Sequence, residues 1–421
     1  MKAKIISKNQ KYLKIEIEIP LSKSMLTSEE AIQKATNLVG KLATGHALTL
    51  FDTDGSPIKI KDKSFTSKGQ VPKVYQTPYG EIEINRHVYQ TNQGGETFCP
   101  LEHDARIIVG TTPKFAKMVT SKYSRGGSQS VQTDLSENHG RTISRSFIQD
   151  ISESVSSIIK EKEAKWQYHV PVSPKLVSTI GVSLDGTCML MVKDGYRSVM
   201  VGTIALYDQQ GERLFTHYTA AAPEYGKSTF LQEFEKEISL IKIKYFNAIY
   251  VGIADGAKDN WLFLEQHTQF QILDFYHATE YLSDVSYNGF KQKEERTEWY
   301  NKSRHNLKYE NGSAKSLLKE IKEFRALKIA EPKLKKIEAA ITYFENHLHQ
   351  MNYSEYSKKY FPIGSGIVEA ACKVIIKQRL CNSGVKWEQA GAQTVLCLRC
   401  FNYTDDKWNQ FWNKINKYGI E

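Results

Sequence analysis

The sequence predicts an α/β fold class, and its main domain is expected in the C-terminal half of the chain. Three observations lead to this prediction. Residues 176–190 form an apolar run with small side chains up to Asp185-Gly186, the pattern of a strand buried within a sheet that ends in a carboxylate. Two further strand patterns follow at 198–208 and 213–222. From Lys227, apolar residues recur at the spacing of a helix.

The order of the elements then predicts the topology of the sheet. We expect a helix at 227–246, a fourth strand at 248–257 that ends in Asp255-Gly256, and a fifth strand followed by a helix at 270–282. Strand, strand, strand, helix, strand, helix, strand is the element order of the ribonuclease-H-like fold. In that fold the first and fourth strands are neighbours. Asp185 and Asp255 are therefore expected to lie close together.

A third acid, Glu369, is the candidate partner of the two aspartates. Gly364-Ser365-Gly366 interrupts the chain before a helical pattern, so Glu369 is expected in the first or second turn with Ser365 as the cap. Neighbouring carboxylates repel one another unless a cation lies between them, and oxygen ligands favour Mg²⁺ or Mn²⁺. A pair of such ions can activate a nucleophile and stabilise the leaving oxygen of a phosphodiester.

Simpler explanations of these residues remain open at this point. An aspartate where a strand ends is often a turn former or a helix cap, which would account for Asp185 alone. Glu369, Lys373 and Lys377 are spaced by four residues, so they can form a solvated row of ion pairs along one helix edge. In the functional interpretation, Lys373, Lys377 and Arg379 instead contact a DNA strand beside the metal ions.

Four segments of the chain together form a characteristic set of motifs. They are Ser183-Leu184-Asp185-Gly186-Thr187, Ala254-Asp255-Gly256-Ala257, Asp274-Phe275-Tyr276-His277-Ala278 and the long block 361–400. This set resembles the DDE transposases of bacterial insertion sequences. Among them the chain is most similar to the Kra-four family, a relative of the Mutator-like group. The resemblance is strong from Leu176 to the C-terminus and weak from about Tyr79 to that point.

The resemblance implies residue roles and a reaction. Asp185, Asp255 and Glu369 would be the catalytic triad and would hold Mg²⁺ or Mn²⁺. Asp274 and His277 match the D-x-x-H motif, which supports the active site in Mutator-like enzymes; in the simpler interpretation Asp274 caps a helix and His277 packs. The enzyme would bind the terminal inverted repeats of double-stranded DNA, nick the element end and join the freed 3′-hydroxyl to target DNA.

Partners and cofactors follow from that chemistry. Pairing two element ends implies a homo-oligomer on DNA. Phosphoryl transfer needs positioning and charge neutralisation, so no organic cofactor is implied. A nucleotide cofactor is also not expected, because Gly364-Ser365-Gly366 lacks the lysine and the length of a phosphate-binding loop.

The N-terminal part of the chain is predicted to contain two regions. Residues 1–111 are rich in strand and turn patterns and are expected to form a small platform domain. Residues 112–165 contain a helix, a break at His139-Gly140 and a second helix from about Thr142, the outline of a helix-turn-helix. In that motif Arg141, Thr142 and Arg145 would face the major groove. A helical hairpin that serves only packing would show the same pattern.

The catalytic domain is expected at 175–421, after a linker at 166–174, and to include a helical insertion at about 283–350. From Lys291 to Ala340 there are 14 Lys and Arg against 8 Glu. These charges can form a self-paired, solvated helix surface. Our alternative hypothesis places part of the insertion on DNA that flanks the cleavage site.

Composition is consistent with such a DNA-binding protein. In the 421 residues, 57 Lys and Arg against 47 Asp and Glu give a net charge of +10, which suits a polyanionic partner. No secretory segment and no apolar run near 18 residues are found, so we expect a cytoplasmic protein without a membrane span. The resemblance implies that it is bacterial and associates with the nucleoid when it acts. Cys397 and Cys400 lie in an apolar helical pattern and are expected to be buried.

Two other functional classes remain compatible with the sequence. A nuclease or junction resolvase on the same fold would share the three acids but would not require specific repeats. A non-catalytic DNA-binding protein derived from a transposase would bind repeats and would tolerate Asp185→Asn.

Overall fold

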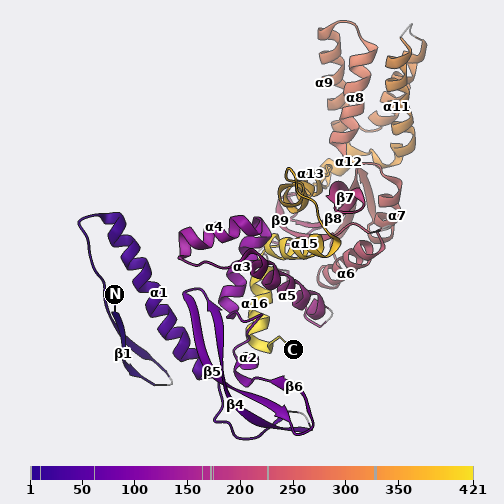
Figure 1. The fold of residues 1–421 in the computed structure, drawn as a ribbon. Helices are drawn as coiled ribbons and strands as arrows, with labels where there is room; N and C mark the ends of the chain where they lie inside the picture. The colour runs from indigo at the N-terminus through magenta and orange to yellow at the C-terminus, as the bar shows by residue number, and fades with distance from the viewer. Residues whose placement is uncertain are drawn as a thin grey trace. The chain divides into compact units, whose positions relative to one another are not determined.

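The computed structural model describes residues 2–9, 11–60, 62–163, 165–170, 173, 175–224, 227–326 and 330–420. This part of the chain is a mixed α/β protein with three separate sheets (Figure 1). Its contacts define two compact units. The first is Met1–His169 with Cys397–Asn402 and Asp406–Glu421, and the second is Val170–Leu396 with Tyr403–Asp405. Helix α15 (Gln389–Tyr403) therefore contributes residues to both.

The second unit contains a five-stranded sheet in the order β11-β10-β7-β8-β9. The strands are β7 (Thr179–Met191), β8 (Gly195–Tyr207), β9 (Arg213–Ala221), β10 (Ile249–Ala254) and β11 (Phe270–Leu273). Strands β7, β8 and β9 form an antiparallel meander, whereas β10 runs parallel to both β7 and β11. The expected pairing of the first strand with the fourth is confirmed.

Strand β7 is longer than the sequence pattern predicted. The expectation that it ends at Asp185-Gly186 is wrong, because β7 stays paired with β8 through Met191. Strand β10 ends earlier, and its last pair with β7 joins Ile253 to Ser183. Asp185 therefore lies just beyond the point where β10 flanks β7. The antiparallel partner alone satisfies the backbone there, and burial changes from continuous to alternating.

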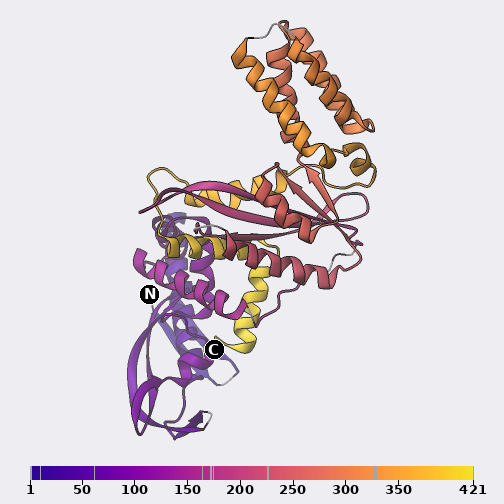
Figure 2. The same cartoon turned by 90° about the vertical axis from the view of Figure 1, so that its right-hand side faces the viewer.

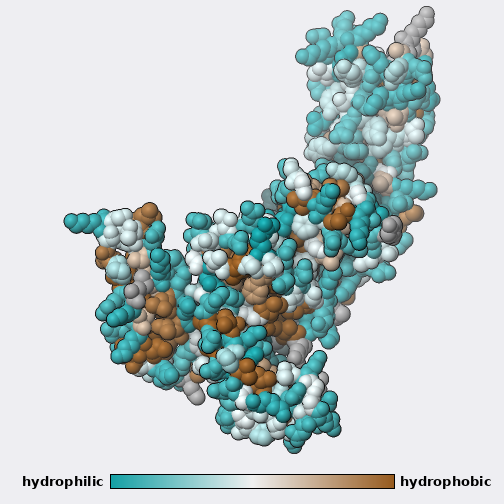
Figure 3. Space-filling view, viewed as in Figure 1, coloured by the Kyte–Doolittle hydropathy of each residue, from teal (hydrophilic) through white to brown (hydrophobic). Residues whose placement is uncertain are grey.

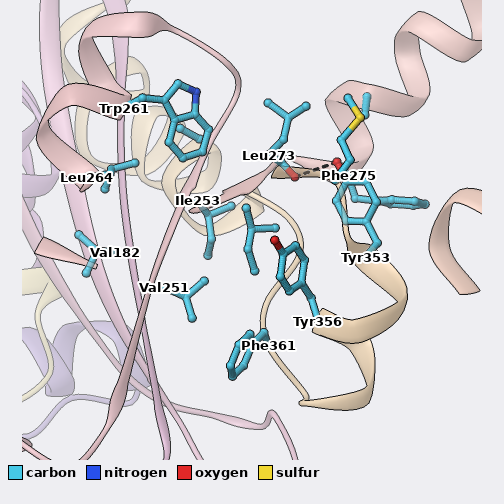
Figure 4. Packing of buried hydrophobic residues seen from close by; sticks show 14 of the residues in the cluster. Val182, Val251, Ile253, Trp261, Leu264, Leu273, Phe275, Tyr353, Tyr356 and Phe361 are labelled. Carbon is cyan, nitrogen blue, oxygen red and sulfur yellow. Dashed lines mark hydrogen bonds between the residues drawn. The ribbon is translucent and has the colours of Figure 1, made fainter. Parts of the chain in front are cut away.

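The core of this unit lies between the sheet and its helices. Strands β7 and β10 are nearly continuous apolar runs, which fits strands covered on both faces. Figure 4 shows Val182 and Ile253 near Leu264, and all three are almost fully buried. Burying one such side chain contributes roughly 1.5–3 kcal/mol. In the same cluster the Tyr353 hydroxyl donates to the carbonyl of Leu273, the last residue of β11, over 3.0 Å (Figure 4).

Helices cover the sheet and lead to the C-terminal block. Helix α6 (Ser228–Lys244) joins β9 to β10, and α7 (Lys258–His267) joins β10 to β11. The block 361–400 contains α13 (Gly366–Ala371), a π-helical turn (Cys372–Lys377) and the short α14 (Gln378–Leu380), in this order. Most of α15 follows.

A group of helices lies in sequence between β11 and α13. It comprises α8 (Phe275–Gly289), α9 (Lys293–Tyr309), α10 (Ser313–Glu323), α11 (Glu331–His347) and the short α12 (Tyr353–Lys358). Figures 1 and 2 show α8, α9 and α11 side by side, extending away from the sheet. Phe290, Trp299 and Phe324 pack against one another, with ring centroids 5.8, 5.3 and 6.0 Å apart. The outer surface of these helices is largely hydrophilic (Figure 3).

The first unit combines two sheets with helices. Strands β1 (Lys2–Lys8) and β2 (Leu13–Glu18) form a hairpin, followed by α1 (Met25–Thr49). A four-stranded antiparallel sheet contains β3 (Ile58–Ile60), β4 (Lys63–Thr77), β5 (Gly80–Thr91) and β6 (Gly94–Phe98). The remaining helices are α2 (Pro100–Asp104), α3 (Pro113–Arg125), α4 (Ser128–His139), α5 (Arg145–Glu163) and α16 (Lys407–Tyr418).

The helical part of the first unit has the expected break. Helix α4 ends at His139, and Gly140 has a left-handed backbone with φ 59°, a conformation that glycine adopts without steric cost. The next helix begins at Arg145 and not at Thr142. This unit contains both regions expected at 1–111 and 112–165. Residues 171, 172 and 174 of the expected linker lie outside the described residues.

Two further sequence expectations concern burial and membranes. Cys397 and Cys400 are buried, as predicted. Among the helices that the structure describes, none combines the length and the apolar character needed to cross a membrane.

Candidate active site

One pocket of the second unit contains all three predicted acids. Asp185 of β7, Asp255 directly after β10 and Glu369 of α13 line a cavity of about 270 Å³. His277, which was also predicted, lines the same cavity. The remaining predicted residue, Asp274, is fully buried and does not line it. The structure thus brings together side chains from three distant segments of the sequence.

Asp185 is held by two hydrogen-bond donors. Its Oδ1 accepts from the backbone N–H of Gly186 over 2.6 Å, and its Oδ2 lies 3.4 Å from Sγ of Cys372, whose thiol donates. Burial raises the pKa of Asp185 above its ordinary value of 3.8, and the nearby charges of Asp255 and Glu369 raise it further. The two donors act in the opposite direction. A partly buried carboxylate beside two others is stabilised by a bound cation.

Asp255 lies in a tight turn after β10. Its Oδ1 accepts from the backbone N–H of Ala257 over 3.2 Å, and its carbonyl oxygen accepts from the hydroxyl of Tyr343 over 2.9 Å. Gly256 has φ 112°, a backbone conformation that favours glycine. A Cβ atom there would also lie 3.0 Å from Nε2 of His347. Glycine at position 256 is therefore favoured where the chain turns beside the pocket.

Glu369 lies in the first turn of α13, as predicted. Ser365 occupies the N-cap position, but its side chain does not cap the helix; its hydroxyl donates to Oε1 of Glu369 over 2.6 Å. The π-helical turn that follows interrupts the regular edge expected for Glu369, Lys373 and Lys377. Such turns occur often at functional sites. Both lysines are exposed, and among the described residues neither forms an ion pair with Glu369.

Asp274 connects three segments around the pocket. Its Oδ1 accepts from the backbone N–H of His277 over 2.7 Å, so it caps α8 as the simpler interpretation expected. Its Oδ2 accepts from the backbone N–H of Ser365, which is 91 residues away in the sequence. Its own backbone N–H donates to Ala254, the last residue of β10, over 2.9 Å. Asp274 is thus a buried residue that holds together three segments next to the pocket.

His277 lines the pocket and also contacts neighbouring side chains. Its Nδ1 lies 3.5 Å from Oε2 of Glu280, which lines the same pocket. Its ring centroid lies 6.2 Å from that of Tyr281 and 6.3 Å from that of Tyr343. His277 therefore packs against two tyrosines, as the simpler interpretation expected, and it also lines the cavity; its role in the active site stays a prediction.

The predicted DNA contacts in the first unit divide into two kinds. Arg141 is only 6% exposed: its Nε donates to the carbonyl of Thr77 over 3.0 Å, and its guanidinium lies 5.3 Å from the ring centroid of Phe115. The expectation that Arg141 faces a DNA groove is wrong for this structure, because its side chain is used in packing. Thr142 and Arg145 are exposed, and Arg145 donates to Ser128 over 3.3 Å.

The predicted contacts after Glu369 divide in the same way. Lys373 and Lys377 are exposed, as a DNA contact requires. Arg379 is 6% exposed, and its guanidinium lies 5.0 Å above the ring centroid of Trp387. The expectation for Arg379 is therefore corrected: its side chain packs against Trp387 within the block 361–400 and does not present its charge at the surface.

Several residues of the site were missed by sequence reasoning. Glu280 is three residues after His277 on α8, so helical spacing could have identified it. Cys372 is three residues after Glu369 and could have been found in the same way. Tyr343 is 88 residues from Asp255, and no local pattern connects the two.

The ligand chemistry of the three acids fits a hard divalent cation. Asp185, Asp255 and Glu369 offer only oxygen atoms, and they take part in none of the ion pairs formed by the described residues. Their side chains share one cavity but are not gathered into a finished site. Within the described ranges, no three Asp, Glu, His or Cys side chains are close enough to hold a metal ion. Side-chain rotation would have to bring the carboxylates together.

A comparison of the sequence with models of protein families gave no match, and a comparison with curated proteins gave none either.

Proposed function

We propose that the protein is a DDE transposase that cleaves DNA at the ends of a bacterial insertion sequence and transfers the freed 3′ ends to target DNA. The main support is the convergence of Asp185, Asp255 and Glu369 on one pocket beside the five-stranded sheet. Two of these acids come from the neighbouring strands β7 and β10, and the third from the helix of the C-terminal block. Three carboxylates that line one pocket support two-metal phosphoryl transfer, because that chemistry uses carboxylate oxygens to hold a pair of ions.

The proposed fold of the catalytic domain is ribonuclease-H-like. A three-stranded antiparallel meander with two parallel strands added beside its first strand supports this assignment. Helices α8 to α11 would then be the helical insertion between the second aspartate and the glutamate. The proposal includes the N-terminal platform and the helical region 112–165 as DNA-binding parts.

In the mechanism that follows, Asp185, Asp255 and Glu369 would hold Mg²⁺ or Mn²⁺. When bound, the ions would activate the attacking oxygen and stabilise the leaving oxygen of the phosphodiester. The protein's own contribution is to orient the carboxylates: Gly186 and Cys372 hold Asp185, Ala257 holds the side chain of Asp255, and Ser365 holds Glu369.

Exposed basic and polar side chains would bind the DNA and position it. Lys373 and Lys377 follow Glu369 and would contact phosphates of the scissile strand. Thr142, which precedes α5, and Arg145, its first residue, would contact the inverted repeats. Cleavage of both element ends would need a homo-oligomer, acting on the nucleoid in the bacterial cytoplasm.

The direct test is cleavage of DNA that carries the element ends. We expect Mg²⁺-dependent nicking by the wild type, and a loss of about a thousandfold or more for Asp185→Asn, Asp255→Asn and Glu369→Gln, since each removes a charged metal ligand. Glu331→Gln is the matched control, because Glu331 pairs with Lys335 on α11, away from the pocket-lining residues.

Each alternative function predicts a different result in this assay. Cleavage that ignores the repeat sequence would favour a nuclease on the same fold. Binding of repeats with no cleavage, unchanged by Asp185→Asn, would favour a non-catalytic DNA-binding protein. Inverted repeats and short target duplications beside the gene would support the transposase.

A further inference from the structure

Glu369 is at the end of a short series of hydrogen bonds that begins at a buried aspartate. Asp274 accepts from the backbone N–H of Ser365, and the hydroxyl of Ser365 donates to Oε1 of Glu369 over 2.6 Å. Asp274 is 0% exposed and Ser365 is 5% exposed, whereas Glu369 is an exposed residue at the pocket. The series therefore connects the rigid interior to a side chain that would otherwise be free to rotate.

The two bonds of Ser365 do different things. Its backbone N–H fixes the start of α13 against Asp274, which is itself held to β10 through the carbonyl of Ala254. Its hydroxyl acts on the carboxylate of Glu369. Serine at an N-cap position usually accepts a hydrogen bond from the helix backbone, but the Ser365 side chain makes no such bond. The hydroxyl is thus used on the glutamate in place of the helix.

This arrangement suits a carboxylate that has to bind a cation. A hydroxyl uses one lone pair of a carboxylate, and about three of its roughly four acceptor positions remain for a metal ion. Glutamate has a long, flexible side chain, and immobilising such a side chain on binding weakens affinity by roughly two- to tenfold. A side chain that is already oriented does not lose this affinity.

We propose that Ser365 is a positioning residue, which orients Glu369 for a divalent cation, and that Asp274 acts through Ser365. The inference depends on the metal site of the proposed function and assigns a role to the aspartate of the D-x-x-H motif. In this role Asp274 touches neither cation nor DNA. It sets the position of the third acid relative to β10, whose end carries the second.

The test is a double-mutant cycle read by Mn²⁺ binding to the full chain without DNA, measured by isothermal titration calorimetry. Ser365→Ala should weaken Mn²⁺ binding about five- to tenfold, the effect of one hydrogen bond to a charged group. In the Glu369→Ala background the same substitution should change affinity by less than about twofold. An equal loss in both backgrounds, or no loss in the wild-type background, would overturn the proposal.

Two further variants separate positioning from general damage. Ser354→Ala is the matched control: Ser354 is also buried, and its hydroxyl has no hydrogen-bond partner in the described part of the chain. Its Mn²⁺ affinity should equal that of the wild type. Ser365→Cys keeps a weaker donor of similar size and is used if Ser365→Ala folds poorly; binding as tight as the wild type would count against the proposal.

The outcome also distinguishes this inference from the proposed function. If the wild type binds Mn²⁺ and cleaves DNA while the cycle shows no coupling, only the role of Ser365 is wrong. If the wild type binds no Mn²⁺ and Glu369→Ala changes nothing, both the metal site and the positioning role are refuted.

Discussion

Charged side chains are paired on the helices α8 to α11, whereas the three acids of the pocket form no ion pairs among the described residues. On the helices, opposite charges are paired: Lys322 with Glu345, Arg325 with Glu338, Lys335 with Glu331 and Lys336 with Asp284. In the pocket, Asp185, Asp255 and Glu369 lie together, and no ion pair of the described residues includes them. These helices contain many Lys and Arg residues, but the four ion pairs lie at an exposed surface.

The contrast between paired and unpaired charges indicates which charged residues belong to a functional site. Exposed ion pairs contribute little to stability and need no ligand to explain them. Burial raises the pKa of Asp185, and the nearby charges of Asp255 and Glu369 raise it further, so ionised Asp185 is disfavoured in the folded state without a cation. The unpaired acids are therefore the stronger indication of a binding site, although the helices contain far more charged residues.

Arg141 represents a third case, a buried charge that donates hydrogen bonds to Thr77 and Gln76, and should show the largest effect on stability. Arg141→Met removes the donors to Thr77 and Gln76 and should lower the free energy of unfolding by about 3 kcal/mol. Denaturant unfolding measures this. Arg145→Met, at an exposed position, should change it by less than about 0.5 kcal/mol. A stable Arg141→Met variant with weakened DNA binding would restore the original DNA-contact hypothesis.

The stability gained from cation binding should depend on the acids of the pocket and not on the acids of the helices α8 to α11. Mn²⁺ at a hundredfold excess over its dissociation constant should raise the free energy of unfolding of the wild type by about 2.7 kcal/mol. Asp185→Asn should lose most of this gain, because it removes a charged ligand, whereas Glu338→Gln should keep it. Thermal unfolding with and without Mn²⁺ measures the gain. A similar gain in all three proteins would mean that the ion binds elsewhere.

The two regions should also respond to pH with opposite sign. Burial raises the pKa of Asp185, so the folded state binds more protons than the unfolded state between 3.8 and the raised value. Metal-free wild type should therefore lose stability relative to Asp185→Asn as pH rises through that window. The hydrogen bond from Arg325 lowers the pKa of Glu338 below 4.5, so its contribution is present above 4.5 and is lost as pH falls through the lowered value.

Difference curves of unfolding free energy between wild type and each variant, measured from pH 3 to 7, would test both signs. Curves that slope in the same direction for Asp185→Asn and Glu338→Gln would contradict the contrast between unpaired and paired acids.

Charge reversal on α11 should give the smallest effect. Reversing Lys333, Lys335 and Lys336 should reduce the salt dependence of DNA affinity by about one unit of slope, since each phosphate contact contributes about 0.9. Lys335 and Lys336 are already paired, so Lys333 should account for most of the change. The slope is obtained from DNA binding at several salt concentrations, with Lys315→Glu on α10 as the control. An unchanged slope would remove this surface from the DNA-binding model.

Much of the fold around the pocket could be predicted from local patterns. Apolar runs and helical spacing located β7 to β9, α6, β10, β11 and α8, because burial on one or two faces imposes a period on the sequence, whereas no range was predicted for α7. The order of these elements matched that of the ribonuclease-H-like fold, in which the first and fourth strands are neighbours, and β7 and β10 do pair. The position of Asp255 after its strand followed directly.

Local patterns could not predict partners that depend on packing. The sequence determined which residues are acidic, which segments form strands and helices, and that Asp185 and Asp255 belong to adjacent strands. Only the tertiary structure decided that β7 continues past Asp185, that Asp274 bonds to Ser365, and that Arg141 is buried. The physical reason is range: periodicity and capping act over a few residues, whereas a hydrogen bond or a buried contact between distant segments depends on how the whole chain packs.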